Sequence, residues 1–259
     1  MLFTEAQLSG WLAAFIWPLL RISSMLVASP VFSARQTPNR LRIGLALLLT
    51  WVLMPALPVV HVESYIGSEA FLLALQQVLV GLMMGFILQM VFAALVFGGQ
   101  VMAFSMGLGF ASMMDPQNGV QVPVVSQFYL IIATLLFLIF DGHLILIGLV
   151  AQSFHTFPVA VDGISRNTFH DIVGWGGIMF SGGVLMALPV IAALLLVNLG
   201  MGVITRAAPQ LHIFVIGFPM TMLVGFILIW VTLPDVMGNF QELLDSGFTL
   251  IRRILGIVG

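Results

Sequence analysis

Long apolar segments, separated by short connectors rich in polar residues, glycine or proline, make up most of this sequence. The pattern predicts apolar helices over about residues 8–31, 41–60, 71–106, 124–154, 175–204 and 211–233, and an amphipathic helix over 236–257. A membrane-spanning helix needs about 20 predominantly apolar residues. We therefore predict an all-α integral membrane protein of about six long apolar helices arranged in hairpins.

The third apolar segment is longer than a bilayer requires. No charged residue occurs between Ala70 and Met114. A helix from Phe71 to Met106 would be about 54 Å long at ~1.5 Å per residue, whereas the hydrocarbon core is about 30 Å thick. The helix must therefore tilt strongly, break, or extend beyond the bilayer under a covering of other protein.

Two glycine pairs lie in this third segment. The spacing of Gly81 and Gly85 would let a second helix approach closely, although this short pattern also arises by chance in apolar runs. Gly98 and Gly99, followed by Gln100, predict a flexible and polar point.

The stretch 107–123 interrupts two apolar segments. It cannot face lipid, because its backbone N–H and C=O groups would have no partners in hydrocarbon, and it is too apolar for an ordinary water-exposed loop. We therefore expect it to lie against other protein, as a plug that closes a protein-conducting membrane assembly. The candidate plug residues are Gly107, Gly109, Phe110, Met113, Met114, Asp115, Pro116 and Pro123.

Methionines gather in the third segment and in the stretch after it. Methionine is flexible and polarizable, and it adapts to irregular surfaces. The cluster is typical of core filler, and the alternative is a soft seal beside the plug. Its members are Met83, Met84, Met90, Met102, Met106, Met113 and Met114.

Three titratable residues lie inside apolar segments. Arg21 is costly there unless paired, so we expect it to snorkel, to meet a carboxylate, or to contact a partner subunit. Asp141 and His143 allow two readings: one long helix with a buried Asp and His, which would permit a proton relay, or a bend at Gly142.

The connectors carry the remaining polar signals. Arg35, Arg40 and Arg42 form the densest basic patch and should face the cytoplasm. We expect residues 155–174 to form a solvated connector. We expect Pro234 to end the sixth helix, and the amphipathic tail after it to lie on the membrane or on a partner.

Composition restricts the function. The chain of 259 residues is 61% hydrophobic and 7% charged, against about 25% charged in soluble domains. Its net charge of −2 gives no indication of nucleic-acid binding, it has no cysteine, and its five histidines are scattered. We expect no metal, no cofactor and no enzymatic activity. A small-molecule or ion transporter stays an alternative, with Arg21, Asp141 and His143 as its candidate charges.

The connection between the fifth and sixth segments carries a specific pattern. It consists of Asn198, Gly202, Arg206, Ala208, Pro209, Gln210, Phe214 and the run Ile216-Gly217-Phe218-Pro219. Together with Trp17 to Arg21, Pro38 to Gly44, Gly107 to Pro123, Gly142-His143 and Phe154-His155, it closely resembles the FliR family of flagellar biosynthetic proteins. The resemblance spans nearly the whole chain.

The resemblance implies a core subunit of the export gate of bacterial type III secretion, with a plug loop near residues 106–123. It implies one copy per gate, assembled with multiple copies of the FliP and FliQ proteins, FlhB as a further partner, and unfolded flagellar subunits as passengers. It also implies a FliP-like part at 1–174, a FliQ-like hairpin and tail at 175–259, and an inner-membrane gate that lies largely on the periplasmic side. Virulence-injectisome relatives share the fold. The residues expected in subunit packing are Arg21, Asn198, Arg206, Pro209, Gln210, Phe214, Gly217 and Pro219.

Overall fold

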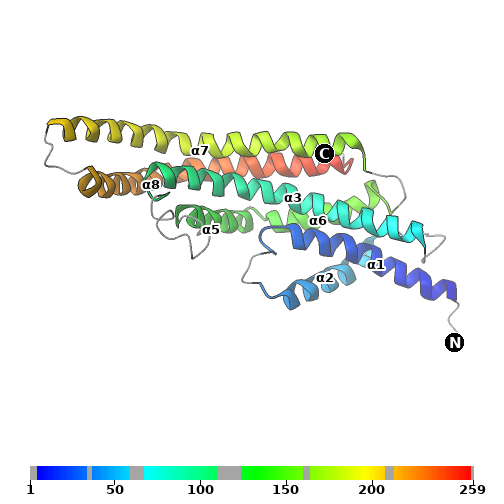
Figure 1. The fold of residues 1–259 in the computed structure, drawn as a ribbon. Helices are drawn as coiled ribbons and strands as arrows, with labels where there is room; N and C mark the ends of the chain where they lie inside the picture. Colours follow the sequence, from blue (N-terminus) through cyan, green and yellow to red (C-terminus); the bar gives the residue numbers. More distant parts are fainter. Residues whose placement is uncertain are drawn as a thin grey trace. The chain divides into compact units, whose positions relative to one another are not determined.

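The structure, a computed structural model, is built from helices. It describes residues 5–33, 37–58, 67–109, 124–159, 164–207 and 213–257, and these ranges contain no β-strand. The helices are α1 (Glu5–Ala28), α2 (Asn39–Leu53), the one-turn 3-10 helix η1 (Met54–Ala56), α3 (Ser68–Ser105), α5 (Val124–Ile139), α6 (Gly142–Thr156), α7 (Arg166–Ala207) and α8 (Ile213–Ile254) (Figure 1). The predicted all-α class is confirmed.

The chain forms two compact units, and three helices run through both. The first unit comprises Met1–Met90, Asp141–Gly174 and Asp245–Gly259, and the second comprises Val91–Phe140 and Trp175–Leu244. Each unit therefore collects segments that are distant in sequence. The predicted division into a FliP-like part at 1–174 and a FliQ-like part at 175–259 comes from the family resemblance. The two compact units do not test it, so it stays a prediction.

Helix α3 contributes to the core of both units. It is 38 residues long and unbroken, so the break that the sequence left open does not occur, and its length corresponds to about 57 Å at ~1.5 Å per residue. In the first unit its Leu73 packs with Ala13 and Trp17 of α1. In the second unit its Phe92 packs edge-on against Phe137 of α5 and Phe240 of α8, with ring centroids 5.7 Å apart in each pair.

Glycines set how closely other helices approach α3. In the first unit, a Cβ on Gly85 would lie 2.5 Å from Ala28 Cβ and 2.8 Å from Met25 O of α1. In the second unit, a Cβ on Gly98 would lie 2.8 Å from Gly183 O of α7, and one on Gly99 would lie 3.0 Å from Ser126 Cα of α5. The close approach predicted for Gly81 and Gly85 is confirmed. The flexible point predicted at Gly98 and Gly99 is wrong, because both are buried packing positions inside an unbroken helix.

The fourth apolar segment breaks between Ile139 and Gly142, so the bend is confirmed and the single long helix is wrong. Asp141 adopts a left-handed backbone conformation, with φ 53°, which few residues other than Gly, Asn and Asp adopt. Its carbonyl accepts the N–H groups of Leu144 and Ile145, at 2.9 and 3.0 Å. Asp141 is exposed and His143 is half-buried, so the reading with a buried aspartate is also wrong.

Helices α7 and α8 are longer than the sequence predicted, at 42 residues each. Residues 166–174, expected in a solvated connector, form the first turns of α7, and His155 belongs to α6. Pro234 does not end a helix, because α8 continues through both Pro219 and Pro234. A proline removes one hydrogen-bond donor and its ring crowds the carbonyl four residues earlier, but packing of the turns on both sides can sustain a long helix despite that cost.

The amphipathic tail forms the last part of α8 and packs on its own chain. Its six periodic apolar residues, Phe240, Leu243, Leu244, Phe248, Ile251 and Leu255, are all at most 9% exposed. In the first unit, Ile251, Ile254 and Leu255 face Val80, Met83, Met84 and Ile87 of α3. The amphipathic pattern is thus confirmed, and the expectation that its apolar face lies on lipid or on a partner is wrong.

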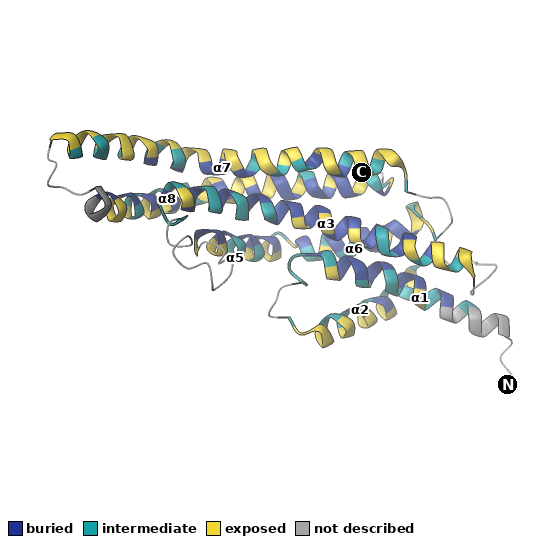
Figure 2. Cartoon of the chain, in the orientation of Figure 1, coloured by how far each residue is buried: buried dark blue, intermediate teal, exposed yellow. Residues whose placement is uncertain are grey.

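Three described helices, α3, α7 and the part of α8 from residue 217 to 254, are long and apolar enough to cross a membrane. A fourth span results if the α5–α6 pair counts as one. Within the most apolar 18 residues of each helix, 67% are buried in α3, but only 28% in α7 and 22% in α8 (Figure 2). Helices α7 and α8 therefore present a large apolar surface outside the chain.

Candidate functional site

The expected plug segment begins at a well-defined helix end. Gly107 follows α3 with φ 82°, its N–H donates to Phe104 O at 3.0 Å, and the N–H of Leu108 donates to Ala103 O at 3.0 Å. These two bonds and the left-handed glycine constitute a Schellman cap. The glycine is required because a side chain is disfavoured at this φ. The cap fixes the direction in which the chain leaves α3.

Helix α8 holds this helix end from the side, within the second unit. The Thr221 hydroxyl lies 3.4 Å from Met106 O and 3.0 Å from Phe218 O. A Cβ on Gly225 would lie 2.6 Å from Met106 Cγ, so the Met106 side chain lies directly on the α8 backbone. The Phe218 ring lies against Gly107, where a Cβ would be 3.1 Å from Phe218 Cδ2. The entrance to the segment is thus anchored on α8.

We expect Gly107→Ala to destabilise the chain by more than Gly256→Ala. Gly256 ends α8 with the same cap and φ 65°, but a Cβ there would meet nothing within 4 Å. Gly256→Ala should therefore cost only the left-handed conformation, about 1–2 kcal/mol. Gly107→Ala adds the contact with Phe218. The measurement is the unfolding midpoint of both variants in detergent, and equal losses would show that the Phe218 contact has no energetic weight.

The structure describes only part of the expected plug. Gly107 and Gly109 lie at its described beginning, whereas Phe110, Met113, Met114, Asp115, Pro116 and Pro123 lie outside the described residues. Of the methionine cluster, Met83, Met84, Met90, Met102 and Met106 are each at most 8% exposed. These five are core residues, which agrees with the prediction that the methionines of this cluster fill the core.

Arg21 forms the main polar cluster in the first unit. Its side chain is 0% exposed. Nε donates to Gln77 Oε1 at 2.8 Å, Nη1 donates to Ser153 Oγ at 2.8 Å, and Nη2 donates to Phe157 O at 3.0 Å. The guanidinium also lies 4.1 Å from the ring centroid of Phe154, a cation–π geometry.

This Arg21 cluster, defined as Arg21, Gln77, Ser153, Phe154 and Phe157, joins α1, α3, α6 and the start of the α6–α7 connector. None of the three hydrogen-bond partners of Arg21 is a carboxylate, and the guanidinium does not reach solvent. The expectations of snorkelling and of a carboxylate pair are therefore wrong. A role for Arg21 in subunit packing stays a prediction. Neutral partners were hard to foresee, although Gln77 stands out as a polar residue in an apolar run.

The residues expected in subunit packing lie along α7 and α8. Asn198 and Arg206 are exposed on α7, and on α8 Gly217 is buried and Pro219 is exposed. Pro209, Gln210 and the side chain of Phe214 lie outside the described residues. The exposed positions leave Asn198 and Arg206 accessible to another chain, so their role in packing stays a prediction.

Known proteins resemble this chain along nearly its whole length. The model of the family described as "Bacterial export proteins, family 1" matches residues 12–247. The chain is 39% identical over 252 residues to the flagellar biosynthetic protein FliR of Escherichia coli K12, covering 97% of this chain and 96% of that protein. It is 39% identical over 253 residues to FliR of Pectobacterium carotovorum, covering 98% and 97%. It is 31% identical over 252 residues to FliR of Bacillus subtilis, covering 95% and 96%.

The long apolar helices and the family model together define the class, which is a membrane-embedded bacterial export protein. Within that class, the chain belongs to the FliR family. The predicted family is thus confirmed. It follows that the chain is a component of the flagellar export apparatus.

Proposed function

We propose that this chain is a core subunit of the flagellar type III export gate in the bacterial inner membrane, where it forms part of the secretion pore. The observation that carries the proposal is the contrast between its helices. The most apolar 18 residues of α3 are 67% buried by its own chain, whereas those of α7 and α8 are only 28% and 22% buried, and both of these helices are 42 residues long. Such helices exceed the thickness of a bilayer, so other subunits are needed to cover the excess.

The expected partners follow from this surface and from the family. We propose FliP and FliQ chains on the exposed faces of α7 and α8, with FlhB as a further partner and unfolded flagellar subunits as passengers. Asn198 and Arg206 would then contribute polar contacts at a subunit interface. Much of the assembled gate would lie on the periplasmic side of the membrane. We propose no catalytic role.

We further propose that the segment after α3 is the plug of this pore. Its support is the anchored entrance: the capped end of α3, fixed on α8 by Met106, Thr221, Gly225 and Phe218. A segment that moves aside for a passenger needs a fixed point from which to move. The apolar composition of 110–114 suits a closed position against protein.

The test is deletion of residues 109–120 from the chain in its assembled complex. We expect the complex to form and to conduct ions at rest, because the α3 cap and the α8 anchor lie outside the deletion. The measurements are conductance in planar bilayers and flagellin export in cells that carry the deletion. Background conductance in an intact complex would refute the plug.

Complete removal of the chain tests the broader function. We expect flagellin export and motility to cease and to return when the full chain is supplied. Export of virulence effectors instead of flagellin would favour the injectisome alternative. Retained export with loss of a small-molecule flux would favour a transporter.

A further inference from the structure

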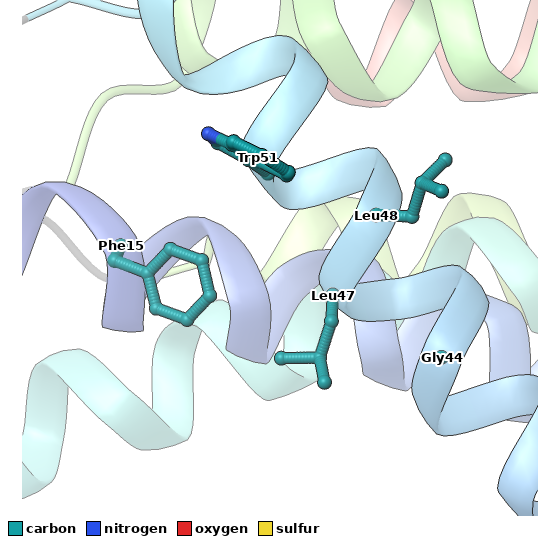
Figure 3. Close-up of a pocket in the computed structure, with 5 residues that line it drawn as sticks. All are labelled: Phe15, Gly44, Leu47, Leu48 and Trp51. Atoms are coloured by element: carbon teal, nitrogen blue, oxygen red, sulfur yellow. The ribbon is translucent and has the colours of Figure 1, made fainter.

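An apolar groove lies between α1 and α2, in the first unit. Phe15 of α1 and Gly44, Leu47, Leu48 and Trp51 of α2 line its volume of about 500 Å³ (Figure 3). The groove is shallow, since Leu48 is 57% exposed and Trp51 is 74% exposed. Its side chains are all apolar, and nothing lies within 4 Å of a Cβ placed on Gly44. The groove is therefore open to a flexible apolar occupant.

One arginine lies at one end of this groove. Arg40 is on the first turn of α2, four residues before Gly44, so it shares the face of α2 that lines the groove. Arg40 is exposed, whereas Arg42 is half-buried on the opposite face of α2, in line with the buried Ala46 and Thr50. No acidic residue occurs anywhere from Gln36 to Val60. The positive charge is thus confined to one end, and the remaining length is apolar.

The spacing of charge and groove fits one leaflet of a bilayer. Gly44 and Trp51 are four and eleven residues from Arg40, which is about 6 and 16 Å along the helix at ~1.5 Å per residue. Half of a hydrocarbon core of about 30 Å is of the same length. The chemistry that matches a cationic end followed by a leaflet-deep apolar groove is an anionic phospholipid.

We propose that the groove between α1 and α2 binds one acyl chain of an anionic phospholipid whose phosphate is held by Arg40. Guanidinium groups bind phosphate oxygens through paired hydrogen bonds, and basic residues beside a membrane attract anionic lipids. The acyl chain would cover Leu47, Leu48 and Trp51, which the chain itself leaves exposed. The binding does not depend on the gate function proposed above.

The first experiment counts lipids on the purified full-length chain by native mass spectrometry. We expect one retained phosphatidylglycerol and no equivalent retention of phosphatidylcholine. Gly44→Leu should abolish that adduct, because the new side chain fills the open space above Gly44. Gly148→Leu is the matched control: it lies on α6, where a Cβ also meets nothing within 4 Å, and it should retain the lipid. Equal retention in both variants, or equal binding of both lipids, would overturn the proposal.

The second variant tests the charged end. Arg40→Gln should weaken phosphatidylglycerol binding by roughly fivefold. Arg252→Gln removes the same charge from an exposed position near the end of α8 and should leave the affinity unchanged. Equal weakening in both variants would show that only net charge matters, and it would overturn the assigned site.

A photo-cross-linking residue at position 48, in membranes of cells that make the full complex, tests which molecule occupies the groove. The proposal expects an adduct with phospholipid. An adduct with another protein chain would overturn it and would identify the groove as a subunit contact.

Discussion

Gln77→Leu is expected to lower the free energy of unfolding by about 1.5–3 kcal/mol, the contribution of a hydrogen bond to a charged group. Arg21 is fully buried, and its Nε donates to Gln77 Oε1. Gln77 is also buried, and its Nε2 has no hydrogen-bond partner among the described residues. The amide therefore contributes chiefly through its bond to the guanidinium. Leucine would leave one donor of a buried cation unsatisfied.

The same substitution should be close to neutral when Arg21 is also replaced. In an Arg21→Met background the buried charge is absent, and a leucine at position 77 then extends an apolar core. The double-mutant cycle of Arg21→Met and Gln77→Leu should thus give a coupling free energy of about 1–3 kcal/mol. The measurement is equilibrium unfolding of the four chains in detergent.

Gln89→Leu provides the control, because Gln89 is an exposed glutamine on the same helix. Its effect should stay within ~0.5 kcal/mol. Additive effects of Arg21→Met and Gln77→Leu would contradict the assignment of Gln77 as a partner of the buried charge. We also expect Gln77→Leu to reduce accumulation of the chain in cells, since a loss of 1–2 kcal/mol changes protein abundance several-fold.

Gly81→Ala is expected to destabilise the chain, although Gly→Ala inside a helix normally stabilises by about 0.5–1 kcal/mol. A Cβ on Gly81 would overlap the carbonyl oxygen of Arg21 and the hydroxyl of Ser24, and it would lie 2.9 Å from the backbone nitrogen of Met25. Backbone atoms cannot rotate away as a side chain can, so α1 must move as a whole. Overpacking of this kind costs about 1–3 kcal/mol, and sometimes more.

Gly148→Ala is the matched control for this prediction. Gly148 lies within α6, where a Cβ would meet nothing within 4 Å. Only the higher helix propensity of alanine should then affect the stability, so the variant should be more stable. The two alanines should therefore shift the unfolding midpoint in opposite directions. A gain in both variants would mean that α1 and α3 are not held at the distance seen here. The shift of α1 in Gly81→Ala should also weaken the Arg21 cluster, so combining it with Gln77→Leu should give less than the sum of the two losses.

The features that the sequence could predict are those that depend on neighbouring residues. The uncharged run predicted a helix over 71–106, with a break inside it left open, and α3 is one unbroken helix. The Asp141-Gly142 pair indicated a turn because few residue types adopt a left-handed conformation, and the chain breaks there. The family motif between α7 and α8 likewise consists of residues that are close together in the sequence. By contrast, proline rules failed at Pro234, because local preference is weaker than the packing of two flanking helical segments.

The amino-acid sequence by itself determined the all-α membrane class, the family, the long third helix and the apolar character of the segment after it. Only the tertiary structure decided which polar groups meet, since the partners of Arg21 come from positions 56, 132 and 136 residues away. It also decided that the C-terminal amphipathic face is buried within the chain, and that Met106 is anchored on Thr221 and Gly225 of α8. The physical reason is that periodicity fixes which face of a helix is apolar, whereas the identity of the neighbour depends on how distant helices pack.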